Sequence, residues 1–192
     1  YFEFVSTGGY DNREYWQDRF ERDGAEVPFE TARAIFVDQT GKPGPAAWEL
    51  GRFPAGKDDY PVSGVSWYEA MAYARFRGKT LPTIYHWGRA AHTRFELAEP
   101  FSPYIVPMSN FEGQGPAPVG QFQGMGFGGA LDIAGNVREW IFTADGKKNR
   151  YCLGGAWNDI GYMFTQSNAL SPWDRSAING FRCMAMPQSA PI

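Results

Sequence analysis

The sequence predicts an α+β domain with two main helices, short antiparallel strands and long ordered loops. Glycine (23 residues) and proline (14) are frequent in the 192-residue chain, and aromatic residues make up 17% of it. Turn residues interrupt regular elements, while aromatic rings supply large apolar anchors for short ones. Because a hydrophobic content of 43% is enough for one sizeable core, we predict a single domain over residues 1–192.

A first, shorter helix is predicted near the start of the chain. Asp11 is followed three residues later by Glu14, which is a helix-start pattern. The aromatic residues at 15, 16 and 20 form one apolar stripe, and Gly24 supplies a stop.

The two main helices follow residues that are typical N-caps. Ser66 and Glu69 have the spacing of a capping box, and Gly78 supplies a stop, so we predict a helix over 66–77. Thr83 is the predicted N-cap of the next helix, which extends to about residue 92.

The remaining elements are predicted to be short strands and ordered loops. Strand candidates bounded by glycine, proline or aspartate are Ala47–Phe53, Arg150–Trp157 and Phe181–Met186. Residues 93–130 are rich in glycine, proline and phenylalanine without clear periodicity, so we predict long ordered loops there.

Charge and cysteine usage exclude several classes of function. The 18 basic and 21 acidic residues are scattered and give a net charge of -3, so we expect no nucleic-acid partner. No apolar stretch is long enough for membrane insertion.

Cys152 and Cys183 are too few for a disulfide framework, which favours a reducing, cytoplasmic compartment. Since the chain opens on Tyr1, we expect that it was cut from a longer polypeptide.

Four motifs occur together in one order. They are YPVSGVSWYEAMAYARFRGKTLPTIYHWGRAA (60–91), ALDIAGNVREW (130–140), LGGAW (153–157) and NGFRC (179–183). With them the chain resembles the formylglycine-generating enzyme, or sulfatase-modifying factor, family. That resemblance implies a C-type lectin-like fold with two helices and a small mixed sheet. The sequence is most similar to the version of this domain fused to bacterial serine/threonine protein kinases, which implies a kinase in the parent chain. Family members ordinarily begin with a strand upstream of the position of Tyr1, so the resemblance also implies that the first strands are missing here.

The cysteine pair of the resembling enzyme has no counterpart in this chain. The family oxidises a substrate cysteine at copper(I) held by two thiolates, and its two cysteines lie between the motifs at 153–157 and 179–183. This interval contains no cysteine; the resemblance puts Asp159 at the first position and Phe164 near the second. We expect Cys152 and Cys183 to be small buried hydrophobes. His86 and His92 fall short of the three-histidine iron site of related enzymes, so we expect neither copper nor iron.

A calcium site is predicted in the segment 130–140. Carboxylates and backbone carbonyls gathered in one turn are suitable ligands for calcium. Carried over from the resembling enzyme, the ligands are Asp132, Gly135, Val137 and Glu139. The alternative is that Asn136 and Glu139 only satisfy backbone groups in a buried turn.

A ligand-binding surface is predicted in the loops between 157 and 175, the stretch that forms the substrate surface in the family. Loop aromatics with a few polar groups are typical of peptide or small-ligand recognition. The candidates are Trp157, Asn158, Asp159, Tyr162, Phe164, Trp173, Asp174 and Arg175. We expect Asp159, Asp174 and Arg175 to be exposed. The alternative is that half of this set anchors the core, with Trp157 the foremost candidate because it follows a Gly-Gly strand.

These observations favour a non-catalytic binding or sensory module, stabilised by calcium, that recognises a peptide, protein or small molecule. One alternative is an oxidoreductase-type enzyme of the same family with a non-copper mechanism. Another is a hypervariable ligand-display domain, because retroelement-diversified proteins use this fold and vary the stretch before the GFR motif.

Overall fold

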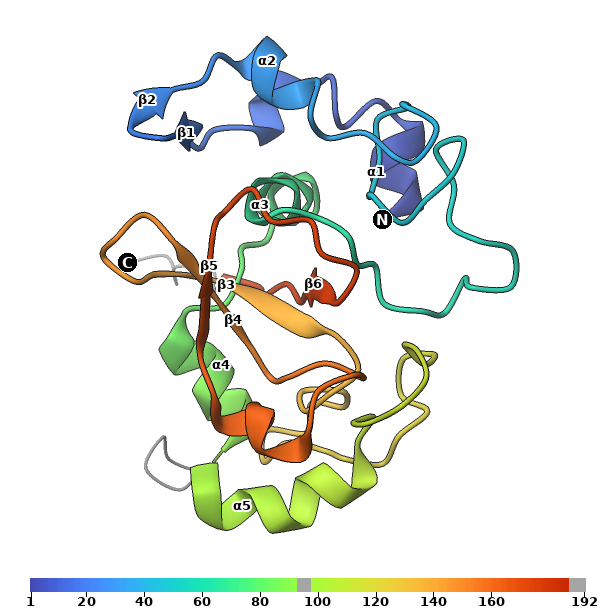
Figure 1. Cartoon of the computed structure of the whole chain (residues 1–192), viewed down its shortest axis with the longest axis vertical. Coiled ribbons are helices and arrows are strands. Elements are labelled where there is room, and N and C mark those ends of the chain that lie inside the picture. The colour runs from blue at the N-terminus through green and yellow to red at the C-terminus, as the bar shows by residue number, and fades with distance from the viewer. Residues whose placement is uncertain (93–97, 187–192) are drawn as a thin grey trace, which may run out of the picture.

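The computed structural model describes residues 1–92 and 98–186. Short helices and strands alternate with long loops along the chain (Figure 1). In order, the elements are α1 (Phe2–Ser6), η1 (Arg13–Tyr15), β1 (Glu21–Arg22), β2 (Ala25–Glu26), α2 (Phe29–Arg33), α3 (Trp67–Phe76), α4 (Ile84–Ala91), α5 (Ala98–Ile105), η3 (Val106–Met108), β3 (Arg138–Ala144), β4 (Arg150–Leu153), η4 (Gly161–Thr165), β5 (Asn168–Leu170) and β6 (Asn179–Phe181).

A four-stranded mixed sheet with the order β5-β4-β3-β6 forms the centre of the fold. Strand β3 pairs antiparallel with β4 and parallel with β6, so Trp140 lies beside Cys152 on one side and Phe181 on the other. The N-terminal segment covers one side of α3 and the sheet lies on the other side (Figure 1). The fold is therefore α+β, and its sheet is mixed because of the parallel β6.

Two apolar clusters fill the interior. The first surrounds α3, where N-terminal aromatics such as Phe4, Trp16 and Phe36 pack on the buried face of the helix. The second lies among α4, α5 and the sheet and includes Trp87, Ile105 and other buried side chains. Short elements are stable here because large aromatic side chains bury much area per residue.

The two main helices are confirmed with their caps. The Ser66 hydroxyl accepts from the Glu69 backbone N–H, and the Glu69 carboxylate accepts from the Ser66 N–H, which completes the predicted capping box. Thr83 caps α4 by accepting from the N–H of His86. Both patterns are local in sequence, which is why the sequence alone predicts them.

The predicted helix after Asp11 is wrong. Only the single turn η1 forms there, capped by the Asn12 side chain, and the β1–β2 hairpin follows. Trp16 and Phe20 are nevertheless buried, at 5% exposure each. The apolar stripe was therefore a signal for the core, and tertiary packing overrode the helical period.

The strand predictions are partly correct. Strand β4 begins at the predicted Arg150 but ends at Leu153, since Gly154 and Gly155 adopt φ angles of 93° and 73°. Strand β6 lies earlier than predicted, and Met184 makes only an isolated bridge with Thr80. The predicted strand Ala47–Phe53 is wrong, because only Glu49 and Arg52 form a bridge there.

Strand β3 and the helical segment of α5 and η3 are among the elements that were not predicted. Strand β3 begins in the motif read as a turn-rich calcium segment, and α5 with η3 lies in the predicted loop region 93–130, of which 93–97 are outside the described residues. Pro103 inside α5 and Pro107 in η3 argue against a helix in a sequence-based reading. Ile105, only 1% exposed, anchors this segment on the second cluster.

Candidate functional site

Asp159, at the place where the resemblance puts the first family cysteine, forms an ion pair with Arg138. The Asp159 carboxylate accepts two hydrogen bonds from Arg138, at 2.9 Å from Nε and 2.7 Å from Nη2, and a third from the Ala156 N–H at 2.8 Å. The exposed fractions of the two side chains are 16% for Arg138 and 13% for Asp159. The prediction that Asp159 is exposed is wrong, because Arg138 at the start of β3 neutralises and orients its carboxylate.

Phe164, near the place of the second family cysteine, belongs to the second apolar cluster. It is 1% exposed, and its ring centroid lies 5.0 Å from that of His92. Burial lowers the pKa of His92 and favours its neutral form. His86 lies in a different environment, at the exposed start of α4, where its Nδ1 is 2.7 Å from the Thr83 hydroxyl.

The two cysteines behave as apolar side chains in the sheet region. Cys152 is fully buried in β4, and burial raises the pKa of its thiol well above the usual range. Cys183 is half-buried just beyond β6, and burial raises the pKa of its thiol to about 11. Since the thiolate is the metal ligand, both sites disfavour soft metals. Over residues 1–92 and 98–186, no group of three or more His, Cys, Asp or Glu side chains is placed to hold a metal ion.

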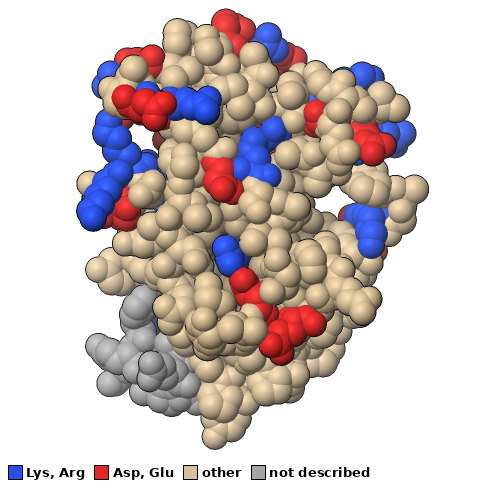
Figure 2. Space-filling model, viewed as in Figure 1, with Lys and Arg blue, Asp and Glu red and all other residues tan. Residues whose placement is uncertain are grey.

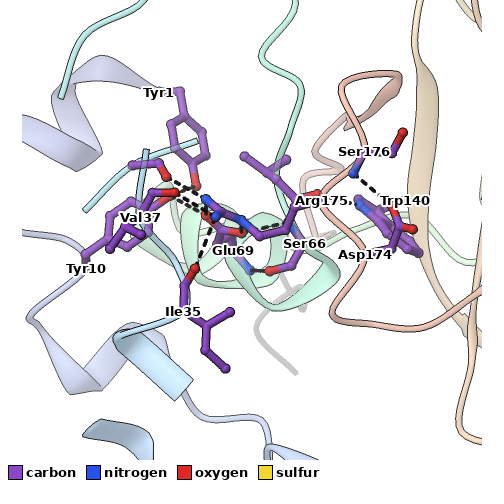
Figure 3. Close-up of polar contacts among 12 residues, drawn as sticks. Tyr1, Tyr10, Ile35, Val37, Ser66, Glu69, Trp140, Asp174, Arg175 and Ser176 are labelled. Carbon is purple, nitrogen blue, oxygen red and sulfur yellow. Dashed lines mark hydrogen bonds and ion pairs between the residues drawn. The ribbon is translucent and has the colours of Figure 1, made fainter. Parts of the chain in front are cut away.

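Arg175, predicted to be exposed and ligand-binding, is a structural residue. Its guanidinium makes two hydrogen bonds of 2.9 Å to the carboxylate of Glu69, which is fully buried (Figure 3). The same group donates to the backbone carbonyls of Ile35, Val37 and Gly44 at 3.2, 2.8 and 2.6 Å. With its donors used in this way, Arg175 fixes the N-terminal segment to α3.

The neighbouring predicted ligand residues have structural contacts too. The Asp174 carboxylate accepts from the Ser176 N–H and from the side chain of Asn179. Trp173 stacks on Phe36, with ring centroids 5.6 Å apart. The indole N–H of Trp173 donates to the Glu21 carbonyl at 2.6 Å. Asp174 is half-buried rather than exposed as predicted, and the turn before β6 uses its carboxylate.

Part of the predicted surface does remain accessible, and it continues onto elements that the sequence did not reveal. Tyr162 is 63% exposed, Ile160 46%, Tyr104 on α5 70%, and Met108 on η3 48%. A Cβ added at Gly161 would lie 2.5 Å from Val106 Cγ1, so η4 touches η3 directly. We call Tyr104, Met108, Ile160 and Tyr162 the apolar surface.

The segment that carries Tyr104 and Met108 of the apolar surface contains no basic residue. No lysine or arginine occurs between Arg94 and Arg138 in the sequence. Asn158 and Glu112 are its exposed polar neighbours, and the Glu112 N–H donates to the Asp159 carbonyl at 3.0 Å. Figure 2 shows the same face dominated by uncharged side chains over α5 and the turn Gly161–Thr165. The missing basic residues were the one signal in the sequence that could have pointed to this surface.

Trp157 lies at the inner edge of this region rather than on it. It is half-buried, and its backbone carbonyl accepts from the Gly113 N–H at 2.6 Å. Its indole nitrogen is buried and has no hydrogen-bond partner among the described residues. The alternative that half of the predicted set anchors the core is correct for Phe164 and Trp173. Trp157, the foremost candidate for an anchor, is only half-buried.

The positions predicted for calcium lie around the turn that leads into β3. Asp132, Val137 and Glu139 line one cavity of about 490 Å³ together with Arg182. Asp132 Oδ2 accepts from the Gly120 N–H at 2.6 Å. Both Glu139 oxygens contact Arg182 at 2.7 Å, and Oε2 also accepts from the Trp87 indole N–H at 2.8 Å. A calcium ion here would share Glu139 with Arg182, while Asp132 keeps Oδ1 available.

The Asn136 side chain in the same turn is fully used by backbone and amide partners. Its Oδ1 accepts from the Ala117 N–H at 2.9 Å and from Asn110 Nδ2 at 3.2 Å, and its Nδ2 donates to the Ala117 carbonyl at 3.1 Å. Asn136 therefore satisfies buried polar groups, as the alternative prediction stated.

None of the helices in the described part of the chain combines the length and the apolar character needed to cross a membrane.

Comparison with known proteins places this geometry in a family. The hercynine oxygenase of Mycolicibacterium smegmatis is 29% identical over 147 residues, covering 72% of this chain and 33% of that protein. The formylglycine-generating enzyme of Mycobacterium tuberculosis is 34% identical over 122 residues, covering 51% and 40%. The inactive C-alpha-formylglycine-generating enzyme 2 of Bos taurus is 32% identical over 152 residues, covering 66% and 50%. The chain spans half or less of the length of each relative.

A solved structure shares the fold over most of the chain. PvdO from Pseudomonas aeruginosa superposes with a TM-score of 0.56 and 17% sequence identity, covering 92% of this chain and 74% of that one. The family profile described as the sulfatase-modifying factor enzyme 1-like domain matches residues 1–186. Because that match includes all but the last six residues, the chain belongs to the formylglycine-generating enzyme, or sulfatase-modifying factor, family.

Proposed function

We propose that the chain is a non-catalytic, ligand-binding member of its family. The observation that carries the proposal is the Arg138–Asp159 ion pair at the place of the first family cysteine. Copper(I) requires soft thiolate ligands, and a carboxylate already bound to a guanidinium is a hard and neutralised substitute. The family also includes a relative whose name describes it as inactive.

The proposed ligand is an extended peptide with apolar side chains and at least one basic residue. The apolar surface offers two tyrosines, a methionine and an isoleucine, a mixture that adapts to varied apolar side chains. The exposed Glu112 beside it, with no lysine or arginine from 95 to 137, favours a basic partner.

Calcium at Asp132 is the second part of the proposal. Two carboxylates line the same cavity, and the left-handed φ angles of Asp132 (53°) and Gly135 (72°) turn the backbone sharply there. Oxygen ligands of this kind suit calcium more than a transition metal. Attachment to a kinase domain stays a prediction, and the sequence of the parent chain tests it.

Catalysis and binding are tested separately. For catalysis, the purified chain is supplied with copper(I), oxygen and a cysteine-containing peptide, and the peptide mass is followed; conversion above a protein-free control would contradict the proposal. For binding, matched arrays of apolar–basic and apolar–acidic peptides are probed with the chain and with Tyr162→Ser and Tyr85→Ser variants. Tyr85, 81% exposed on α4, is the control for losing a surface tyrosine.

The expected result is selective capture of apolar–basic peptides that Tyr162→Ser abolishes and Tyr85→Ser preserves. Equal capture of both arrays, or a Tyr162→Ser variant that binds like the unmodified chain, would show that the apolar surface is not the ligand site.

A further inference from the structure

A second cavity, separate from the apolar surface, lies between α1, the loop over 47–63 and the end of β6. Its volume is about 640 Å³, within the range of small-molecule sites. The loop leaves the body of the molecule as a wide excursion, which forms the outer wall (Figure 1). The cavity shares no residue with the apolar surface, so its role is independent of the peptide binding proposed above. Pro61 and Phe181 also line the cavity beside Asp132.

Aromatic rings form much of the wall and hold one another in fixed orientations. Trp48 and Phe53 meet edge to face with centroids 5.6 Å apart, and Tyr73 meets Phe181 edge to face at 5.5 Å. Rings held by several such contacts present flat faces and edges without a large loss of side-chain freedom on binding. This wall suits a flat, aromatic ligand.

The charged residues around the cavity are mainly basic. Lys57, Arg77 and Lys79 line it, against the single carboxylate of Asp58. Lys79 forms no ion pair with any residue in the described ranges. Arg77 contacts Glu3 at 3.4 Å and also hydrogen-bonds to the Tyr73 side chain, and Lys57 lies over the Tyr60 ring at 3.7 Å from its centroid. Lys79 is therefore available to an anionic ligand, and the excess of basic over acidic side chains around the cavity favours one.

We propose that this cavity binds a small aromatic carboxylate, whose ring lies against the Trp48 and Tyr73 sides of the wall and whose anionic group contacts Lys79. The ring of such a ligand matches the aromatic side chains of the wall, and its carboxylate matches the excess of basic side chains.

Cys183 provides a built-in reporter, because it lines the cavity while Cys152 is fully buried elsewhere in the sheet. The probe is 2-naphthoate, and its matched neutral control is 2-naphthamide. Alkylation of Cys183 by an uncharged maleimide at alkaline pH is followed by mass spectrometry with each compound present, and Cys152 is the internal control for unfolding. Isothermal titration of the same compounds gives the dissociation constants.

The expected result is that 2-naphthoate slows alkylation of Cys183 several-fold and 2-naphthamide does so much less. Lys79→Gln raises the dissociation constant of 2-naphthoate about fivefold, as expected for one partly exposed ion pair. Lys147→Gln, which removes an exposed lysine outside the cavity, leaves it unchanged. Absence of protection, equal protection by the two compounds, or equal effects of the two lysine variants would overturn the proposal.

Discussion

At the scale of single residues, the Arg138–Asp159 ion pair stands at the place of the first family cysteine. Each is largely buried, so loss of either partner leaves the other charge poorly solvated. We predict that Asp159→Asn lowers the free energy of unfolding by about 2 kcal/mol, measured by denaturant titration. Glu112→Gln, an exposed acid on the adjoining loop, should change it by less than about 0.5 kcal/mol. Equal effects would mean that the ion pair does not organise this loop.

The calcium prediction also belongs to a single side chain. Asp132 and Asp23 both have left-handed φ angles, 53° and 52°, so a change to glycine relieves the same backbone constraint at each position. Saturating calcium should raise the melting temperature by about 5 to 10 °C if its concentration is about a hundred times the dissociation constant. Asp132→Gly should lose that rise, while Asp23→Gly in the β1–β2 turn should keep it. A response that survives in Asp132→Gly would place the ion elsewhere.

At the scale of secondary-structure elements, the stability of α3 depends strongly on one buried side chain, the N-cap Ser66 of its capping box. Ser66 satisfies the Glu69 N–H, and no water can replace its hydroxyl because the residue is fully buried. We predict that Ser66→Ala costs about 1 to 2 kcal/mol in thermal or denaturant unfolding. Asn12→Ala removes a comparable cap from the exposed turn η1 and should cost clearly less. A smaller cost at Ser66 than at Asn12 would contradict this order.

The stretch from residue 158 to residue 178, which ends just before β6, supports a prediction about tolerated variation. Asn158, Ile160, Gln166 and Ser167 are exposed, whereas buried contacts hold Phe164, Trp173 and Arg175. Saturation mutagenesis read out by soluble, protease-resistant expression should accept most residues at the first set and few at the second. A display domain that varies over the whole stretch would accept both sets, so this scan also tests that alternative.

Sequence patterns predicted those elements whose cause is local. The caps at Ser66 and Thr83 involve residues three positions apart, so α3 and α4 could be predicted. Strand β3 could not, because Trp140 and Ile141 are both buried and no alternation marks a central strand.

For the candidate site, the sequence alone correctly predicted only that the family cysteines are missing. The absence of cysteine between 156 and 179 is visible in the sequence. The exposure of Asp159 and Arg175 was predicted wrongly because their partners lie far along the chain. Arg138 is 21 residues from Asp159, and Glu69 is 106 residues from Arg175. Ion pairs between residues so far apart in the sequence cannot be predicted from the spacing of neighbouring residues.

At the scale of the whole molecule, one buried network joins three distant parts of the chain. Glu69 on α3 accepts from Arg175 near the C-terminus and, at 2.7 Å, from the Tyr10 hydroxyl in the N-terminal segment (Figure 3). Burial and the nearby Glu69 raise the pKa of Tyr10 well above the usual range, so its hydroxyl stays a donor. Because Arg175 also binds the backbone carbonyls at 35, 37 and 44, the network links the N-terminal segment to the helix.

We predict that Arg175→Met lowers the free energy of unfolding by about 3 to 5 kcal/mol, since it leaves the Glu69 carboxylate buried without its cation. Arg175→Lys should recover little, because an ammonium cannot make two parallel bonds to the carboxylate and still reach three carbonyls. Adding Glu69→Gln to Arg175→Met should restore part of the loss, which a double-mutant cycle measures. Arg22→Met, which removes an exposed arginine of β1, is the control for removing a charge.

Limited proteolysis separates local detachment from global unfolding in the same variants. If the network fixes the N-terminal segment, Arg175→Met should be cleaved first within residues 1–50, at denaturant concentrations where the sheet still resists. Simultaneous cleavage of both regions would mean that the N-terminal aromatics and the sheet unfold as one unit. In that case the shared apolar cluster around α3, rather than the Glu69–Arg175 pair, would be what joins the two parts of the fold.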